Sequence, residues 1–369
     1  MISNGFIKSS RPKVLVAMSG GVDSSVAAYL LKEQGYDVTG ATIKTWVANS
    51  CESKNTRACC AVEGVEDARS VCRKLDIPYY VLDFEKDFKR DVVDYFASEY
   101  LKGRTPNPCI ACNEKIKFKG FLERAKDLGF DLMATGHYAR RIERNGRFLV
   151  AEGFDKTKDQ AYVLFPLVQE DLARTLLPMG EHKKDKIREI ARDLGLRVAD
   201  KPDSMEICFV PSNDYGKFLT NEGGAQAKKG VIRLKSGEVL GEHDGFFHFT
   251  IGQRRGIGVA YTEPLYVIQI LPETNEVVVG TKEDVRAKEF TVSRINWIVD
   301  PATVQELECF VKIRSNSAKA SAHVKVASDK VSAHVTFCEP TEAITPGQAA
   351  VFFDEDVVLG GGWIDNVIQ

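Results

Sequence analysis

The sequence predicts an α/β protein: a doubly wound parallel sheet in the first half of the chain, followed by β-rich domains. In the first half, short apolar runs alternate with segments of helical periodicity, which is typical of strands covered by helices on both faces. A glycine-rich loop separates the first predicted strand from the first predicted helix. After Gly223 and Gly224, short alternating strands and turn signals replace this pattern.

The parallel sheet is expected to contain four strands. Residues 14–18 form a continuous apolar run, and apolar residues at helical spacing follow from Val26 to Leu31. The other predicted strands are 38–46, 79–82 and 132–135, and helices are predicted at 65–75, 88–101 and 114–128. Residues 155–220 are expected to be mostly helical, with an amphipathic segment at 183–194.

The second half is expected to form small barrels or sandwiches. Predicted strands lie at 231–234, 265–271, 276–279, 309–313, 320–327 and 331–337. We therefore divide the chain into an α/β domain with a helical extension (1–222), a small central domain (223–286) and a C-terminal β-barrel (287–369).

Composition excludes several classes of protein. The 369 residues include 50 Lys plus Arg and 52 Asp plus Glu, so the net charge of −2 argues against a polybasic binder but allows a local basic face. We find no apolar run near the roughly 18 residues that span a bilayer and no export signal, so a cytoplasmic protein is expected. Nine cysteines in such a chain do not indicate a disulfide framework, although some of them are candidates for reactive or metal-binding thiols.

Residues 19–25, SGGVDSS, lie between a buried strand and a helix. Glycines allow close approach of a ligand, and amides at a helix N-terminus favour an anion. The loop is not a GxxxxGK[ST] phosphate loop, but it resembles the PP-loop of ATP pyrophosphatases. That resemblance implies adenylation of a substrate oxygen with release of pyrophosphate, and Asp23 as a partner of the Mg²⁺ that accompanies ATP. By itself the loop leaves amide synthetases, lysidine synthetases and thiolation enzymes open.

Cys109 and Cys112 form a Cys-x-x-Cys motif that precedes Lys115, Lys117 and Lys119. Such a pair can be a redox dithiol, half of a metal site, or a nucleophile with a neighbour. Cys59 and Cys60 are adjacent and no His pair has ligand spacing, which disfavours structural zinc. Taken alone, Cys208 would be a core thiol within an apolar stretch.

Seven motifs together carry a family resemblance. In order they are SGGVDSS, RTPNPCIACNEKIKF, ATGHYAR, KDQAYVLF, DSMEICFVP, TIGQRRGIG and TPGQAAVF. From about residue 13 to the C-terminus the chain resembles the tRNA-specific 2-thiouridylase family. The resemblance implies a PP-loop domain, a small central domain and a C-terminal β-barrel, which agrees with the pattern of predicted elements.

The resemblance also implies a reaction. ATP adenylates the C2 oxygen of the wobble uridine of tRNA, and sulfur then displaces AMP. Cys112 matches the family nucleophile and Cys208 matches the persulfide carrier. Sulfur leaves the carrier through a disulfide between these two residues or as hydrosulfide, and Lys115 is expected to favour the Cys112 thiolate. A cysteine desulfurase or sulfur relay protein is implied as the donor.

Binding residues follow residue by residue from the resemblance. The residues that match ATP contacts are Ala17, Met18, Ser19, Gly20, Gly21, Val22, Asp23, Ser24, Ile43 and Gly136. The residues that match tRNA contacts are Asn107, Pro108, Cys109, His137, Lys158, Asp159, Gln160, Arg314, Ser315 and Gln348. The target base must be turned out of the anticodon loop to reach the site.

Two positions depart from the family pattern. Cys109 stands where well-known members carry Asp, so Cys109, Cys112 and Cys208 form a three-cysteine set. In related thiolating enzymes such a set holds a 4Fe–4S cluster with one open iron site, which makes a cluster an alternative to the persulfide relay. Ser315 stands where the family has Tyr, so aromatic stacking is lost while Arg314 keeps its charge.

Three further alternatives remain at this stage. Another PP-loop ATP-dependent ligase would need no cysteine. A tRNA-binding protein with a vestigial nucleotide site would release no pyrophosphate. A sulfurtransferase acting on a different RNA would share all of these motifs.

Overall fold

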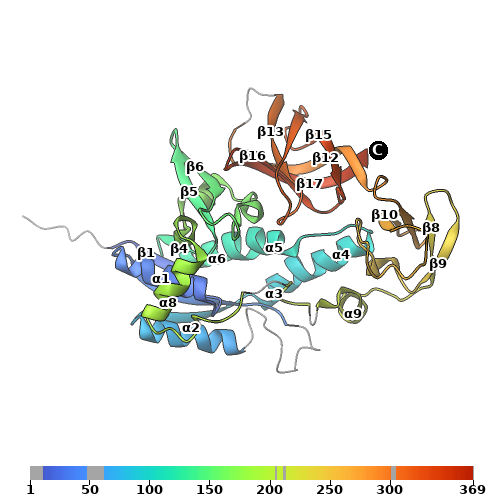
Figure 1. Ribbon diagram of the computed structural model, residues 1–369. Helices are drawn as coiled ribbons and strands as arrows, with labels where there is room; N and C mark the ends of the chain where they lie inside the picture. Colours follow the sequence, from blue (N-terminus) through green and yellow to red (C-terminus); the bar gives the residue numbers. More distant parts are fainter. Residues whose placement is uncertain (1–10, 48–61, 204–205, 211–212, 301–304, 369) are drawn as a thin grey trace, which may run out of the picture.

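The computed structural model describes residues 11–47, 62–203, 206–210, 213–300 and 305–368. Cys51, Cys59 and Cys60 therefore lie outside the described residues. An α/β layer holds the N-terminal half, a red and orange barrel holds the C-terminal part, and a small yellow sheet lies beside both (Figure 1).

The α/β layer is built on a parallel sheet with strand order β3-β2-β1-β4-β7. Every pairing in it is parallel, which confirms the predicted doubly wound sheet. Its strands are β1 (Lys13–Ala17), β2 (Asp37–Lys44), β3 (Tyr79–Asp83), β4 (Leu132–Ala134) and β7 (Thr175–Leu176). The two-residue strand β7 was not predicted, because two residues are too short to show a period.

Helices cover both faces of this sheet. Leu15 packs into a core with the helices of residues 85–127, whereas Val14 and Val16 pack with α1, α2 and α8 on the opposite face. On the first face lie α3 (Glu85–Phe88), η2 (Lys89–Asp94), α4 (Tyr95–Leu101), α5 (Pro108–Ala111), η3 (Cys112–Gly120) and α6 (Phe121–Asp127). On the second lie α1 (Val22–Glu33), α2 (Val62–Lys74) and α8 (Lys184–Asp193). Burial on both faces explains why β1 is continuously apolar.

The prediction of a mostly helical segment over 155–220 is only partly correct. Short helices are separated by extended connections, and β7 lies among them. These helices are η4 (Ala161–Leu164), α7 (Gln169–Ala173), η5 (Pro178–Glu181), α8 and α9 (Tyr215–Asn221). Only α8 has a long amphipathic period, and tertiary contacts determine the other elements.

A hairpin of β5 (Ala139–Arg144) and β6 (Arg147–Glu152) was not predicted. Its turn residues Asn145 and Gly146 both have positive φ, at 54° and 73°. Asn-Gly is a strong sequence signal for a two-residue hairpin turn, so this element was detectable from the sequence.

Two β-structures follow. The central sheet has the order β10-β11-β8-β9, and the barrel runs β12-β15-β14-β13-β16-β17 and closes through pairing of β12 with β17. The central strands are β8 (Gly230–Leu234), β9 (Val239–His243), β10 (Tyr266–Leu271) and β11 (Glu276–Gly280), with η7 (Phe246–His248). The barrel strands are β12 (Arg286–Trp297), β13 (Glu306–Lys312), β14 (Ala320–Val326), β15 (Ala333–Glu342), β16 (Ala349–Asp354) and β17 (Val357–Ile368).

Strand β17 joins the barrel to the N-terminal half. It pairs with β6 through Val357 and Ala151, and a Cβ on Gly361 would come within 2.9 Å of the Phe165 ring. The glycine run in β17 therefore allows close approach rather than a turn. Strands β9, β12, β16 and β17 were missed from the sequence; β16 is buried at five successive positions and so does not alternate.

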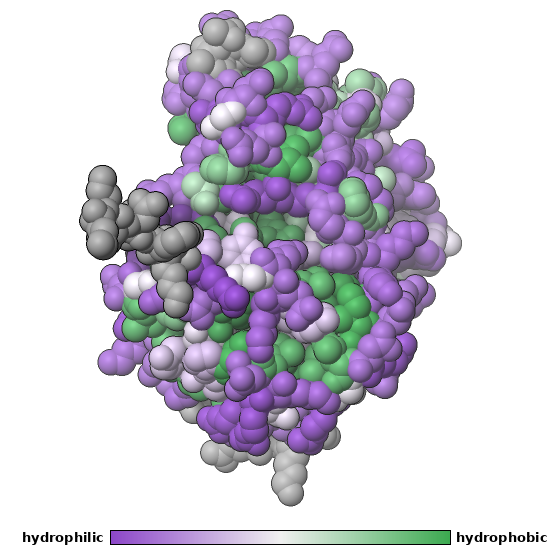
Figure 2. Space-filling model, turned by 90° about the vertical axis from the view of Figure 1, so that its left-hand side faces the viewer, coloured by the Kyte–Doolittle hydropathy of each residue, from purple (hydrophilic) through white to green (hydrophobic). Residues whose placement is uncertain are grey.

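No helix in the described part of the chain is long and apolar enough to cross a membrane. Figure 2 shows that the left-hand face of Figure 1 is mostly hydrophilic and carries several separate hydrophobic patches.

The central position of β1 makes its core side chain sensitive to truncation. Leu15 is 0% exposed, so Leu15→Ala should lower the free energy of unfolding by about 2–5 kcal/mol. Leu128→Ala, at a side chain that is 49% exposed, should change it by less than about 0.5 kcal/mol. Urea unfolding of both variants measures the difference, and equal losses would contradict the assigned core.

Candidate active site

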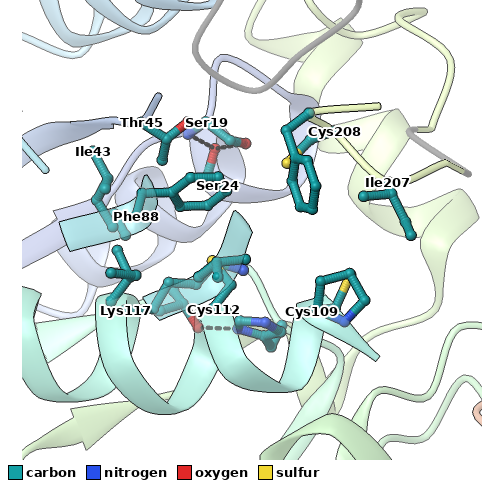
Figure 3. Close-up of a pocket in the computed structure, with 18 of the residues that line it drawn as sticks. Ser19, Ser24, Ile43, Thr45, Phe88, Cys109, Cys112, Lys117, Ile207 and Cys208 are labelled. Atoms are coloured by element: carbon teal, nitrogen blue, oxygen red, sulfur yellow. Dashed lines mark hydrogen bonds between the residues drawn. The ribbon is translucent and has the colours of Figure 1, made fainter. Parts of the chain in front are cut away.

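A cavity of about 330 Å³ lies at the carboxyl ends of β1, β2 and β4. Its wall contains residues that directly follow these strands: Met18 after β1, Thr45 after β2, and Thr135 after β4. The strand order reverses between β1 and β4, and ligands of open α/β sheets bind at such a switch point. The sheet topology alone therefore identifies this cavity as the candidate site (Figure 3).

The loop at 19–25 is held by its own hydroxyl groups and glycines. The Ser19 amide donates to the Ser24 hydroxyl at 3.2 Å, and the Ser25 hydroxyl donates to the Gly21 carbonyl at 2.7 Å. Gly20 has φ of 73°, and a Cβ there would lie 2.3 Å from the Gly64 carbonyl oxygen. Both the left-handed backbone and the close approach of α2 require glycine at position 20.

Gly136 approaches this loop from the end of β4. A Cβ on Gly136 would lie 2.8 Å from the Ser24 nitrogen, closer than real Cβ atoms come to backbone. The glycine therefore permits two loops to meet, rather than a tight turn.

Most predicted nucleotide contacts lie together in the cavity wall. These are Ala17, Met18, Ser19, Asp23, Ser24, Ile43 and Gly136. Gly20, Gly21 and Val22 do not line it: the glycines shape the loop, and Val22 is only 3% exposed in the core.

The three predicted thiols line the same cavity from two segments. Asn107 caps the helix that begins at Pro108, because its side chain accepts from the Cys109 amide at 3.1 Å. Cys109 and Cys112 lie on that helix, and Cys112 stands where it changes from α5 into the wider η3. Cys208 and Ile207 come from a separate segment across the cavity (Figure 3).

A lysine lies in the cavity wall, but it is Lys117 rather than Lys115. Lys115 pairs with Glu114 at 2.6 Å on the surface. Lys117 donates to the Asn113 side chain at 2.9 Å and lines the cavity with Cys112. The prediction that Lys115 provides the positive charge is therefore wrong, because the chain is a π-helix from Cys112 to Gly120, whose i→i+5 hydrogen bonds place residue 117 rather than residue 115 on the face of Cys112.

The three cysteines do not form a metal site as they are placed. In the described ranges, no group of three His, Cys, Asp or Glu side chains is arranged to hold a metal ion. None of the three is in a disulfide; Cys109 is exposed, whereas Cys112 and Cys208 are half-buried.

An ionic network lies behind the phosphate loop, which is the loop of residues 19–25. The Lys184 ammonium is 2.7 and 2.8 Å from the two Asp23 carboxylate oxygens and 2.9 Å from an oxygen of Asp203. Asp203 also accepts from Lys158 at 2.8 Å and from Arg188 at 3.1 Å. Burial alone would raise the pKa of Asp203, but hydrogen bonds from Lys158 and Lys184 lower it to about 2. Asp203 is therefore ionised at any physiological pH.

Tyr138 completes this network. Its hydroxyl donates to Asp23 at 2.6 Å, and its ring lies 5.6 Å from the Lys184 ammonium. Burial and the Asp23 carboxylate raise the pKa of Tyr138, so the phenol stays protonated as a donor.

Several predicted tRNA contacts hold the fold together. Asp159 accepts from the Gly153 and Ala161 amides, and Gln160 accepts from the Tyr138 amide at 2.9 Å. Gln348 donates to the Thr105 carbonyl at 2.9 Å. Arg314 is exposed on the barrel beside the half-buried Ser315. Pro108, Cys109, His137 and Gln160 also line the cavity, whereas Asn107, Lys158, Asp159 and the three barrel residues do not.

His137 is only 7% exposed and its Nδ1 lies 2.7 Å from the Thr135 hydroxyl. Burial, and then the charge of Lys117, hold the pKa of His137 well below its usual value. The imidazole is therefore neutral near pH 7.

Sequence reasoning missed other site residues. Thr45, Phe88 and Lys117 line the cavity, and Lys184 and Asp203 lie in the ionic network. Tyr138 and Asp203 stand inside quoted motifs, which was a signal; Phe88 and Lys184 gave none, because long-range packing brings them to the site.

With this geometry established, three family models match the chain. They are a tRNA methyl transferase HUP domain at residues 12–212, a tRNA methyl transferase PRC-barrel domain at 216–281, and an aminomethyltransferase β-barrel domain at 287–364. Proteins named tRNA-specific 2-thiouridylase MnmA match nearly the whole chain. The one from Clostridium perfringens is 47% identical over 97% of this chain and 100% of its own. The one from Carboxydothermus hydrogenoformans is 49% identical over 96% of this chain and 98% of its own.

The chain belongs to the tRNA-specific 2-thiouridylase family. Among solved structures, the U34-tRNA thiolase NcsA from Methanococcus maripaludis with its [4Fe-4S] cluster is 20% identical, with a TM-score of 0.34, covering 58% of this chain and 67% of that chain. A 4-thiouridine synthetase–RNA complex with bound ATP is 19% identical, with a TM-score of 0.37, and the match covers 55% of this chain and 46% of that chain. The family assignment confirms the resemblance drawn from the seven motifs.

Burial of a neutral His137 makes stability depend on pH in this thiouridylase-family chain. The folded-state pKa is lowered from 6.5, so the unfolded chain binds a proton that the folded chain does not. The stability that neutral His137 contributes is fully present above about pH 6.5, the ordinary pKa of histidine. It is lost as the pH falls below that value, by at most about 1.4 kcal/mol per pH unit. His137→Gln should therefore lose less stability than wild type between about pH 7.5 and about pH 5.5.

Urea unfolding at the two pH values measures this loss. The matched control is His323→Gln, at a side chain that is 47% exposed on the barrel, and it should keep the wild-type loss. If His137→Gln loses as much stability as wild type between the two pH values, the assigned burial of a neutral His137 is contradicted.

Proposed function

We propose that this chain is a tRNA-uridine 2-sulfurtransferase that thiolates C2 of the wobble uridine at the expense of ATP. Membership in the 2-thiouridylase family supports the transferase class. The observation that carries the detailed proposal is one cavity lined both by the phosphate loop and by Cys109, Cys112 and Cys208. A PP-loop ligase of another kind would have no use for thiols facing its nucleotide.

In the first step, the C2 oxygen of uridine attacks the α-phosphorus of ATP and pyrophosphate leaves. Ser19, Ser24 and the loop amides lie where they would bind the phosphates, and Ile43 and Gly136 lie where they would contact the nucleoside. Oxygen ligands suit Mg²⁺, and the Asp23 carboxylate in the cavity wall would hold it directly or through water. Mg²⁺ would neutralise phosphate charge. The product of the first step is an adenylated uridine, in which AMP is the leaving group on C2.

In the second step, sulfur replaces that group. Cys208 carries a persulfide, and the Cys112 thiolate attacks its inner sulfur. A Cys112–Cys208 disulfide forms, hydrosulfide leaves with the electron pair, and hydrosulfide attacks C2 while AMP departs. An external thiol must then reduce the disulfide. The Lys117 ammonium in the same wall favours the thiolate at Cys112.

We assign residues 1–222 to catalysis, and residues 223–286 and 287–369 to holding the tRNA. Asn107, Pro108 and Cys109 would surround the everted base, because they begin the helix that carries Cys112. Lys158, Arg314 and Ser315 would contact the RNA, whereas His137, Asp159, Gln160 and Gln348 would act by shaping the surface that binds it. A cysteine desulfurase or relay protein in the cytoplasm would load Cys208.

A 4Fe–4S cluster is not part of this proposal. In the described residues, the three thiols as placed do not fit a three-cysteine ligand set, which favours the persulfide relay. Cys109 is then an auxiliary thiol at the edge of the cavity.

Substituting the two relay thiols tests the function. Cys112→Ser and Cys208→Ser should each lower the thiolation rate by about a thousandfold or more, because Cys208 carries the transferred sulfur and Cys112 releases it by attacking Cys208. Both variants should still release pyrophosphate when tRNA is added, since adenylation needs no thiol. Thiolated tRNA is measured on mercury-containing gels, and pyrophosphate by a coupled assay.

The matched control is Cys338→Ser, because Cys338 is exposed on the barrel. Cys109→Ala should retain most thiolation with a persulfide donor. Loss of thiolation in Cys109→Ala, together with about four irons per chain in anaerobically purified wild type, would overturn the relay. Thiolation that persists in Cys112→Ser would overturn the nucleophile assignment.

A further inference from the structure

Lys184 is a buried cation with two anionic partners. It is the first residue of α8, its side chain is 8% exposed, and its backbone amide donates to Asp155 at 2.9 Å. Its ammonium has three donors, and two oxygens of Asp23 and one of Asp203 accept them. A buried charge of this kind is costly unless it is fully paired, so its two partners are coupled through it.

The two partners belong to different parts of the site. Asp23 belongs to the phosphate loop, in the first turn of α1, and lines the cavity. Asp203 does not line the cavity, but it precedes the segment of Ile207 and Cys208 in the chain. One ammonium therefore connects the nucleotide end of the site to the sulfur end.

The chain leading to Cys208 is tied down largely by cations. Arg188 donates to the carbonyls of Ala199 and Lys201 at 3.0 and 3.2 Å and to Asp203 at 3.1 Å. Lys201 in turn lies 3.3 Å from the Gly20 carbonyl of the phosphate loop. Residues 199–203 thus lie against α8 and the phosphate loop through charged contacts, which respond to any new charge nearby.

Mg²⁺ and a triphosphate would bring such charge to Asp23. A divalent ion competes with Lys184 for the Asp23 carboxylate, and phosphate oxygens attract the ammonium. The ion frees the ammonium from Asp23, and the phosphate oxygens then draw it away from Asp203. The contacts of residues 199–203 then weaken, although Lys158 and Arg188 still hold Asp203.

We propose that Lys184 is a positioning residue that couples occupancy of the nucleotide site to the placement of the Cys208 segment through Asp203. The inference rests on the proposed function, because it takes ATP as the ligand and Cys208 as the sulfur carrier. The coupling would release the segment of Ile207 and Cys208 when ATP is bound and the uridine can be activated.

Amide hydrogen exchange of residues 199–203 tests the coupling on the full chain. These residues do not line the cavity, so a bound nucleotide does not simply cover them. In wild type, Mg²⁺ with α,β-methylene-ATP should speed their exchange several-fold. In Asp203→Asn and Lys184→Met, exchange should already be fast without nucleotide and should change little on its addition. Lys186→Met is the matched control, because Lys186 is exposed on the same helix and pairs with Glu189, and it should behave as wild type.

Titration calorimetry measures whether the same nucleotide binds, which distinguishes failure of the coupling from failure of the proposed function. Nucleotide that binds wild type without changing this exchange, or that changes it equally in Asp203→Asn, overturns the coupling and leaves the proposed function standing. No nucleotide binding by wild type overturns the proposed function itself. A purely structural role for Asp203 predicts faster exchange throughout the molecule, whereas the coupling confines the change to this segment.

Discussion

The parallel pairing of β1 between β2 and β4 is the constraint on which the site depends. It brings the ends of three strands to one edge of the sheet and places the phosphate loop opposite the loop after β4. The two loops meet so closely that Gly136 has no room for a Cβ beside Ser24. Since both faces of the sheet are packed, this edge is the opening that the topology offers to a ligand.

Charge is concentrated immediately behind that opening. Asp23, Asp203 and Lys184 form a partly buried network, and Tyr138 is held in it as a neutral donor. Such a network is stable only when every member is paired, so it transmits changes at one end to the other. The thiols line the cavity from two segments, Cys109 and Cys112 from a helix and Cys208 from a separate part of the chain.

The described residues of the barrel and the central sheet extend the N-terminal half without lining the cavity. The β5–β6 hairpin leaves the N-terminal half to pair with β17, and the glycines of β17 let the barrel approach Phe165. Fixed domain contacts of this kind would hold a large RNA in a set position relative to the cavity, as the proposed function requires.

The sequence by itself determined the parallel sheet and the loop at 19–25, because strand periods and loop chemistry are local properties, whereas the resemblance to the family singled out the three thiols. It also contained an Asn-Gly signal for the β5–β6 hairpin. Strands β16 and β17 could not be predicted from alternation, because burial on both faces removes it. Only the tertiary structure decided that Lys117 rather than Lys115 faces the cavity, and that His137 is buried and neutral. It alone brought Lys184 between Asp23 and Asp203, since a contact across 161 residues of chain depends on packing that no local pattern records.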